Sequence, residues 1–323
     1  MATMALPFTT LDVFTETRFH GNPLAVVTIP PGIVLTQAQK QAIAREFNLS
    51  ETTFVHDLDV EASAPTDKDK DTRRFDIFTP YAEIPFAGHP TIGTAALLYS
   101  TGVRTLLAKA GPISIERVRD GSLRAAIPHN TRLHEKRVPS PGRSPTPTPI
   151  PALQDTVARA EHGAPLFSIV KGMTFALIEL PSLEALGAVT VGSRPDLPAD
   201  LLDAGWRDGW VTRRYYFVRL GCGSVDGRNV HRIRTRMVKL AMEDPATGSA
   251  ACALAGYLGL YALQERSAAF EITQGVEMGR GSTLLVDVDV EADEGSAGAR
   301  KLGALHLGGK AVPVMSGSIA VPL

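Results

Sequence analysis

The order of hydrophobic and polar residues predicts short strands interleaved with helices. Apolar runs typical of strands cover Phe8 to Phe14 and Leu24 to Ile29, with a turn at Gly21-Asn22-Pro23 between them. The stretch Thr36 to Phe47 has the spacing of an amphipathic helix, with Thr36 as its N-cap and Asn48 as a left-handed stop. The beginning of the chain is therefore expected to mix both kinds of element.

The same pattern continues along the chain. The dipeptide Asp120-Gly121 between two alternating stretches is a strong hairpin signal. Polar residues at 61–72 and 293–300 predict solvated loops. Further strands are expected at Thr52 to Val55, Phe75 to Phe78, Ile113 to Arg117, Leu123 to Ile127, Ser168 to Val170, Thr174 to Glu179, Tyr215 to Arg219, Glu271 to Thr273 and Leu284 to Val290.

One short pattern occurs twice, nearly half the chain apart. His89-Pro90-Thr91-Ile92-Gly93-Thr94-Ala95-Ala96 aligns with Asp244-Pro245-Ala246-Thr247-Gly248-Ser249-Ala250-Ala251, and each copy opens an apolar stretch of helical composition, at Thr91 to Ser100 in the first copy. Proline suits a first helical turn and aspartate is a favoured N-cap, so each helix start would present one titratable side chain. Two such starts facing one another would form a cleft. Ordinary capped core helices in a duplicated fold remain the alternative.

The length of 323 residues is enough for two domains, each with its own core. The segment 139–151 is rich in proline, unlike the sequence before it, and this composition predicts a linker between the two halves. The weaker interpretation is a ligand for a proline-recognising module. The expected division is a first half at 1–135, a linker at 136–165 and a second half at 166–323. The last strand near the C-terminus is free to return to the first half.

Charge and hydropathy narrow the classes of function. With 33 Lys and Arg against 34 Asp and Glu, the chain offers no electrostatic reason to bind nucleic acid or a membrane surface. No eighteen apolar residues occur in succession, so a cytoplasmic protein is expected. Alternating basic residues at 232, 234 and 236 are interpreted as one exposed strand face.

The cysteines exclude several kinds of site. The two present, Cys222 and Cys252, have no paired spacing, so neither a disulfide framework nor a zinc site is indicated. The sequence Gly221-Cys222-Gly223 lacks the third glycine and the following helix of a dinucleotide-binding loop. We therefore expect no cofactor and no metal.

Several blocks of residues, in order between about Phe8 and Val290, resemble the phenazine-biosynthesis PhzF-like isomerase family. Residues 129–165 and 190–225 carry little of this resemblance. The blocks are Gly21-Asn22-Pro23-Leu24-Ala25-Val26-Val27, Asn48-Leu49-Ser50-Glu51-Thr52-Thr53-Phe54, Phe78-Thr79-Pro80, Pro85-Phe86-Ala87-Gly88-His89-Pro90-Thr91, Glu243-Asp244-Pro245-Ala246-Thr247-Gly248-Ser249-Ala250, and Gln274-Gly275 with Met278-Gly279-Arg280.

The resemblance implies an α/β (α+β) diaminopimelate-epimerase-like fold, in which two pseudo-symmetric halves each wrap a curved, mostly antiparallel sheet around a central helix. In related epimerases the two helix starts carry a pair of cysteines, and here His89 and Asp244 are expected in those places. Because Cys222 and Cys252 fall elsewhere, the sequence does not support a two-thiol racemisation.

The family's proton-shuttling carboxylate matches Glu51. From spacing alone Glu51 would be a surface residue at a corner between helix and strand, but partial burial beside Leu49 and Phe54 would suit a carboxyl group that takes and returns a proton. The resemblance favours the second interpretation. The implied catalytic residues are Glu51, His89 and Asp244, and the implied substrate-binding residues are Gly88, Gly248, Ser249 and Asn22.

The expected activity is a cofactor-independent isomerisation that moves a proton between carbons of a small carboxylated ring similar to a dihydro-hydroxyanthranilate. The alternatives are an epimerase or cyclase acting on another amino or hydroxy acid, and a non-catalytic small-molecule binding protein. A homodimer is the assembly that base rates favour. The sequence leaves the true substrate and the stereochemistry open.

Overall fold

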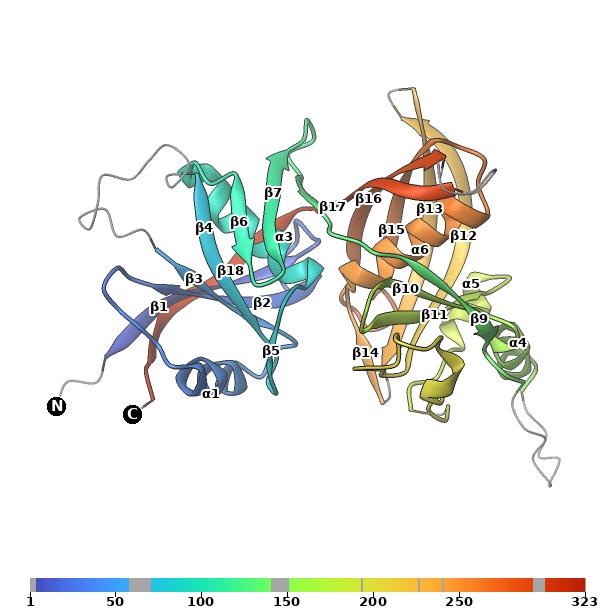
Figure 1. Ribbon diagram of the computed structural model, residues 1–323, viewed down its shortest axis with the longest axis horizontal. Coiled ribbons are helices and arrows are strands. Elements are labelled where there is room, and N and C mark those ends of the chain that lie inside the picture. The colour runs from blue at the N-terminus through green and yellow to red at the C-terminus, as the bar shows by residue number, and fades with distance from the viewer. Residues whose placement is uncertain are drawn as a thin grey trace. The chain divides into compact units, whose positions relative to one another are not determined.

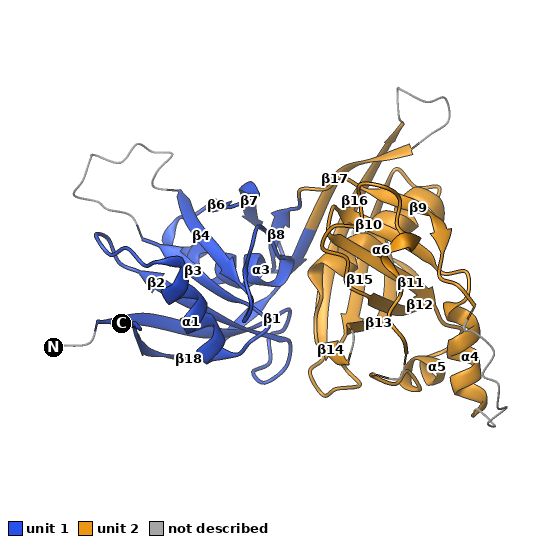
Figure 2. Ribbon diagram, turned by 60° about the horizontal axis from the view of Figure 1, so that its bottom comes forward, with its two compact units in different colours: residues 1–127, 307–323 blue, residues 128–306 orange. Residues whose placement is uncertain are grey.

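The chain divides into two compact units, which consist of residues 1–127 with 307–323 and of residues 128–306 (Figure 2). A computed structural model describes residues 4–57, 71–140, 151–192, 194–225, 227–239, 241–292 and 300–322. Residues 61–70 and 293–299 of the predicted loops, and 141–150 of the proline-rich segment, lie outside these ranges.

Unit 1 contains the first strands of the chain, the helices α1 and α3, and the last strand (Figure 1). Its elements are β1 (Ala5–Val13), β2 (Asn22–Ile29), α1 (Gln37–Phe47), β3 (Thr52–His56), β4 (Thr72–Phe78), β5 (Glu83–Ile84), α3 (Gly88–Leu98), the 3-10 helix η1 (Tyr99–Thr101), β6 (Thr105–Ala108), β7 (Gly111–Arg117), β8 (Leu123–Ala126) and β18 (Ala311–Ala320). The predicted hairpin around Gly121 is confirmed, because β7 and β8 pair antiparallel.

Unit 2 contains the remaining elements, and β17 runs from it into unit 1. They are β9 (Arg132–Arg137), α4 (Ala152–Glu161), β10 (Pro165–Val170), β11 (Met173–Glu179), α5 (Leu183–Gly187), the 3-10 helix η2 (Ala199–Leu201), β12 (Arg213–Val225), β13 (Arg228–Lys239), β14 (Met242–Asp244), α6 (Gly248–Tyr261), β15 (Ser267–Gln274), β16 (Ser282–Ala292) and β17 (Arg300–Gly309).

The two units repeat one topology. In unit 1, β2 pairs parallel with β3 and β4 pairs parallel with β6, whereas β1 with β2 and β18, β3 with β4, β4 with β5, β6 with β7 and β7 with β8 pair antiparallel. In unit 2, β11 pairs parallel with β12 and β13 with β15, again among antiparallel neighbours. In both units a short strand, β5 or β14, leads directly into the longest buried helix. The duplication inferred from sequence is therefore present in the topology.

The register of the repeat differs from the predicted one. Helix α3 begins at Gly88 and α6 begins at Gly248, so the residue of unit 2 that corresponds to His89 is Ser249. Asp244 is not an N-cap, since it ends β14 and Thr247 occupies the N-cap position. The physical reason is that proline is tolerated both inside a first helical turn, where Pro90 lies, and before a helix, so the His-Pro and Asp-Pro pairs do not mark the same place.

Helices α3 and α6 lie at the centre of their units. Every residue of α3 from Gly88 to Ala95 is buried, and α3 contacts β1, β2, β3, β8 and β18. In α6 all residues except Tyr257 and Tyr261 are buried, and the helix contacts β10, β11, β15 and β16. The strands of each unit therefore surround an apolar helix, as the family resemblance implied.

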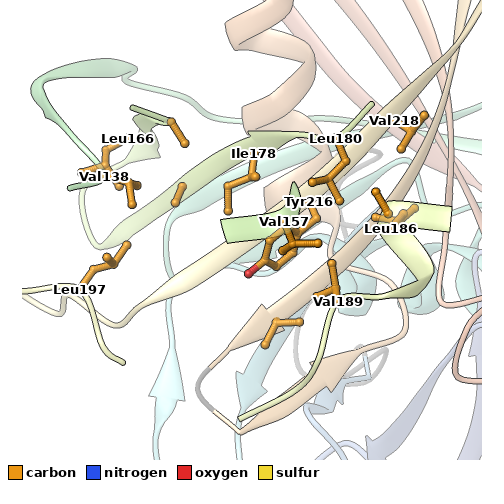
Figure 3. Packing of buried hydrophobic residues seen from close by; sticks show 14 of the residues in the cluster. Val138, Val157, Leu166, Ile178, Leu180, Leu186, Val189, Leu197, Tyr216 and Val218 are labelled. Atoms are coloured by element: carbon orange, nitrogen blue, oxygen red, sulfur yellow. The ribbon is translucent and has the colours of Figure 1, made fainter. Parts of the chain in front are cut away.

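Helices α4 and α5 also pack against the sheet of unit 2, and Figure 3 shows hydrophobic side chains of this cluster. Val157 of α4 and Leu186 of α5 pack with Ile178 of β11 and Tyr216 of β12. The alternate residues of β11 point to the opposite face, which α6 contacts. Because both faces are covered, β11 consists of a nearly continuous apolar run.

The boundary between the units lies after residue 127, not after residue 135. The strand β9 belongs to unit 2 because it pairs antiparallel with β10. Within the segment expected to be a linker, residues 152–161 form α4. The C-terminal strand β18 does return to unit 1, where it pairs with β1.

Candidate active site

Glu51 lies at a sharp corner between α1 and β3. Helix α1 begins with a capping box at Thr36 and ends at Asn48 in the left-handed conformation, as predicted, and β3 starts at Thr52. The four residues from Asn48 to Glu51 therefore turn the chain from helix to strand. The side chain of Glu51 is 18% exposed, so its carboxylate is partly buried.

His89 lies in the first turn of α3, with its side chain 5% exposed. Its Nδ1 atom is 3.3 Å from Oε2 of Glu51. At this distance the imidazole and the carboxylate can share a proton, with either group as the donor according to their protonation. The structure thus brings two of the three predicted catalytic side chains together.

The packing of α3 against the sheet fixes this pair. The hydroxyl groups of Thr53 on β3 and Thr94 on α3 are 3.1 Å apart and hydrogen-bonded. A Cβ added at Gly93 would lie 2.5 Å from Cδ2 of Leu24 and 2.7 Å from Cγ2 of Val13. Only a glycine lets the helix approach the sheet this closely, so the sequence Ile92-Gly93-Thr94 determines how His89 meets Glu51.

Asn22 is the first residue of β2 and is buried. Because β2 and β3 run parallel, both strands begin at the same end of the sheet. The hydroxyl of Ser50 donates a hydrogen bond of 3.4 Å to Oδ1 of Asn22, next to Glu51 in the chain. Asn22 is therefore a neighbour of the Glu51 corner, and its role in binding the substrate stays a prediction.

Asp244 lies in unit 2, at the end of β14. The hydroxyl of Thr247 donates a hydrogen bond of 2.6 Å to its Oδ2 atom. The adjacent Glu243 forms two hydrogen bonds with the guanidinium of Arg236 on β13, at 2.8 and 2.7 Å. This buried pair anchors β14, and the hydrogen bonds to Glu243 raise the pKa of Arg236 further above its ordinary value.

Arg236 also corrects one prediction. The basic residues on β13 do share one strand face, but that face is not uniformly exposed, because Arg236 is 6% exposed and Arg234 is only partly exposed. Each has an acidic partner: Arg232 lies 3.6 Å from Glu271, Arg234 3.0 Å from Glu277 and Arg236 2.7 Å from Glu243. The alternating arginines of β13 therefore form ion pairs with acidic residues of neighbouring strands and loops.

Gly88 and Gly248 are the first residues of the two central helices, and Ser249 follows in the first turn of α6 with 9% exposure. The first N–H groups of a helix lack intrahelical partners and attract anions. These positions are suited to a carboxylate. That they bind one, and that Asp244 and Ser249 meet the same substrate as Glu51, stays a prediction.

Sequence reasoning missed Gln274 and Tyr215. Gln274 is fully buried at the end of β15 and bonds to both Asp244 and Thr247, and its side-chain oxygen accepts from the hydroxyl of Tyr215. The only signal was the Gln274-Gly275 pair among the blocks of resemblance, which gave no reason for a glutamine there.

Neither a reactive buried cysteine nor a cluster of metal-ligating side chains is found among the residues that the structure describes. Cys252 is fully buried within α6, and burial raises the pKa of its thiol well above the usual range. Among the residues that the structure describes, no group of three or more His, Cys, Asp or Glu side chains is placed to hold a metal ion. Within the same ranges, no helix has the length and apolar character needed to cross a membrane.

Duplicated curved sheets, each around a buried helix, are the architecture of the diaminopimelate-epimerase-like class. The crystal structure of a PhzF-family phenazine biosynthesis protein of Bacillus anthracis has the same fold, with a TM-score of 0.68 at 20% identity, covering 98% of this chain and 100% of that one. The predicted fold class is thereby confirmed.

The sequence matches the family model of phenazine biosynthesis-like proteins over residues 11–317. An uncharacterized isomerase of Mesorhizobium japonicum is 32% identical over 319 residues, which cover 96% of this chain and 97% of that protein. The trans-2,3-dihydro-3-hydroxyanthranilate isomerase of Pseudomonas fluorescens is 33% identical over 300 residues, covering 88% and 91%. The chain belongs to the phenazine biosynthesis-like family, and it is an isomerase of that family, as predicted.

Proposed function

We propose that this isomerase moves a proton between two carbons of a small carboxylated ring without a cofactor, and that Glu51 carries the proton. The observation that supports this most directly is the partly buried carboxylate of Glu51, 3.3 Å from the imidazole of His89. A proton shift from one carbon to another changes no oxidation state of the molecule overall. It therefore requires a base that becomes an acid, and a single carboxyl group fills both roles.

In the proposed reaction Glu51 removes a proton from a carbon next to an unsaturated or carbonyl system. The electron pair of the broken C–H bond moves through the conjugated system to another carbon of the same ring, and protonated Glu51 returns the proton to that carbon. His89 stays within hydrogen-bonding distance of the carboxyl group and holds its orientation in both steps.

The remaining predicted residues would bind and orient the substrate. Asp244 would accept hydrogen bonds from an amino or hydroxyl group on the ring, and Asn22 would lie beside the Glu51 corner. The backbone amides around Gly88, Gly248 and Ser249 would hold the carboxylate.

The alternative of a two-base epimerisation has less support. Such a reaction needs one acid/base group for each face of the reacting carbon. Helix α6 offers Ser249 where α3 offers His89, and the thiol of Cys252 is fully buried. A hydroxyl group is a poor base at neutral pH, so the two helix starts do not carry a matched pair.

The test is proton NMR in heavy water with trans-2,3-dihydro-3-hydroxyanthranilate and a panel of cyclic amino and hydroxy acids. The wild type should introduce deuterium at a ring carbon of at least one compound, and Glu51→Gln should not, although its circular dichroism spectrum is unchanged. A pure binding protein would leave every carbon unlabelled. Equal labelling by the wild type and Glu51→Gln would remove Glu51 from the proposed role.

A further inference from the structure

We propose that Thr247 and Gln274 are positioning residues that hold the carboxylate of Asp244 in one orientation, in a hydrogen-bonded chain that begins at Tyr215. The proposal rests on the proposed function only in assigning Asp244 to the substrate. The chain itself lies entirely within unit 2 and is defined by hydrogen bonds that the structure shows.

The first observation is that Thr247 does not cap its own helix. It occupies the N-cap position of α6 in an extended conformation, yet its side chain accepts no hydrogen bond from the first turn. In the same chain Thr36 caps α1 and Ser182 caps α5 in the ordinary way. A cap of this kind stabilises a helix, because it satisfies a backbone N–H that has no partner within the helix. At Thr247 that stabilisation is given up, and the hydroxyl bonds to Asp244 instead.

The second observation is that the amide of Gln274 is fully used and can adopt only one orientation. Its nitrogen lies 2.7 Å from the carbonyl oxygen of Asp244 and 3.1 Å from Oγ1 of Thr247. Its oxygen accepts from the backbone N–H of Thr247 at 3.3 Å and from the hydroxyl of Tyr215 at 3.1 Å. A carbonyl can only accept and an N–H can only donate, so the amide cannot be flipped.

These two facts fix the direction of the hydrogen bond to Asp244. Because Gln274 donates to Oγ1 of Thr247, the single hydroxyl proton of Thr247 is left to point at Oδ2 of Asp244. The oxygen atoms are 2.6 Å apart, within the range typical of a hydroxyl bonded to a carboxylate. One carboxylate oxygen is thereby held in place.

Tyr215 keeps the other end of the chain fixed. It is completely buried on β12, and burial raises the pKa of its hydroxyl well above the usual range. The hydroxyl therefore remains protonated and can act as the donor to Gln274. Since β12, β14 and β15 are all joined through β13 in one sheet, the chain connects Asp244 to a rigid part of the core.

The restrained orientation of the Asp244 carboxylate is expected to affect the reaction rate more than substrate binding. A carboxylate that must meet a specific hydroxyl or amino group gains rate when its rotation is restricted before the substrate arrives. Loss of the Thr247 hydroxyl removes this restraint on Oδ2 of Asp244 without removing the charge. We therefore expect the maximal rate to fall more than the apparent affinity.

The test compares three variants on the substrate that the wild type labels. Thr247→Val should lower kcat by about 10-fold to 100-fold with KM changed by less than about threefold. Thr247→Ser, which restores the hydroxyl, should recover most of the wild-type kcat. Ser282→Ala is the matched control, because this buried hydroxyl bonds to the backbone carbonyl oxygens of Pro245 and Arg280 and not to the carboxylate.

A second measurement needs no substrate, so it separates this proposal from the proposed function. The carboxyl resonance of Asp244 in aspartate-labelled protein, assigned by its loss in Asp244→Asn, should move in Thr247→Val and stay in place in Ser282→Ala. A resonance that moves equally in both variants, or a Thr247→Ser enzyme as slow as Thr247→Val, would overturn the positioning role. If no compound is labelled by the wild type, the proposed function fails and the resonance still decides the question.

Discussion

The carboxylate of Glu51 and the imidazole of His89 lie 3.3 Å apart because two independent local structures meet. The left-handed Asn48 ends α1 so that Glu51 precedes β3, and β5 ends so that His89 falls in the first turn of α3. The hydrogen bond between the Thr53 and Thr94 hydroxyls then joins β3 to α3. The pair is a product of the packing in unit 1.

Replacement of His89 should separate its orienting role from the proton transfer itself. An asparagine can place an amide nitrogen near the position of Nδ1, whereas a leucine cannot. We expect His89→Leu to lower kcat by about 100-fold and His89→Asn by about 10-fold, in the range found for positioned acid/base groups. Steady-state kinetics on the compound labelled by the wild type measures this, and equal rates for the two variants would contradict it.

A methyl group at Gly93 should disturb the same packing. Its Cβ would lie 2.5 and 2.7 Å from side chains of Leu24 and Val13, both fully buried and unable to move aside. We expect Gly93→Ala to destabilise the protein by about 1–3 kcal/mol, in spite of the better helix propensity of alanine. Gly187→Ala is the control, since this helical glycine has open space around its Cβ position and should be neutral or stabilising. Urea unfolding of both variants gives the comparison.

The sequence was most informative where a structure depends on neighbouring residues. The cap at Thr36, the stop at Asn48 and the hairpin at Gly121 were all predicted, because each depends on a few adjacent side chains. The register of the repeat was not. Which residue begins α6 is decided by the pairing of β14 with β13 and by the bonds of Thr247, and these depend on residues far away in the chain.

The residues of the candidate site also differ in whether the local sequence could identify them. Glu51, His89 and Asn22 could be identified because they lie within continuous blocks of family resemblance. Gln274 and Tyr215 could not be connected to Asp244, since their contact requires that β13 pair parallel with β15 and antiparallel with both β12 and β14. No local pattern encodes that register.

Alanine substitutions at two glycines of one turn are expected to destabilise the protein to very different extents. Gly275 and Gly279 both have φ of +76°, but a Cβ at Gly275 would lie 2.5 Å from the carbonyl oxygen of Pro245 and 2.6 Å from that of Arg280. Around Gly279 the space is open. Gly279→Ala should cost about 1 kcal/mol from backbone strain alone.

Gly275→Ala should cost more than about 3 kcal/mol, because backbone atoms must also move. It should in addition lower activity, since Pro245 follows Asp244 directly. Thermal unfolding and activity assays check both effects. Similar melting temperatures for the two variants would contradict the argument.

A buried charge cluster in unit 1 predicts a pH dependence of stability. Asp76 on β4 lies 2.5 Å from Nζ of Lys40 on α1 and 2.7 Å from Nε2 of His56 on β3, and Arg74 approaches from the same strand. Burial alone would raise the pKa of Asp76, but the hydrogen bonds from His56 and Lys40 outweigh it and hold the pKa well below the ordinary value. The cluster joins α1 to the sheet behind the Glu51 corner.

The lowered pKa of Asp76 determines whether stability rises or falls with pH. A carboxyl group that binds its proton less readily in the folded state contributes full stability above its unfolded pKa of about 3.9 and loses it as the pH falls towards the folded value. Asp76→Asn lacks this contribution and leaves Lys40 buried without its partner, so it should be less stable than the wild type by about 3 kcal/mol at pH 7. The difference should narrow only below about pH 4.

Urea unfolding of the wild type and Asp76→Asn at several pH values measures that difference directly. Asp155→Asn is the matched control, because Asp155 pairs with Arg159 on the surface of α4, where an ion pair contributes less than about 1 kcal/mol. The control should follow the wild type at every pH. A gap between the wild type and Asp76→Asn that stayed constant down to about pH 2 would mean that the Asp76 carboxylate is not what holds Lys40 and His56.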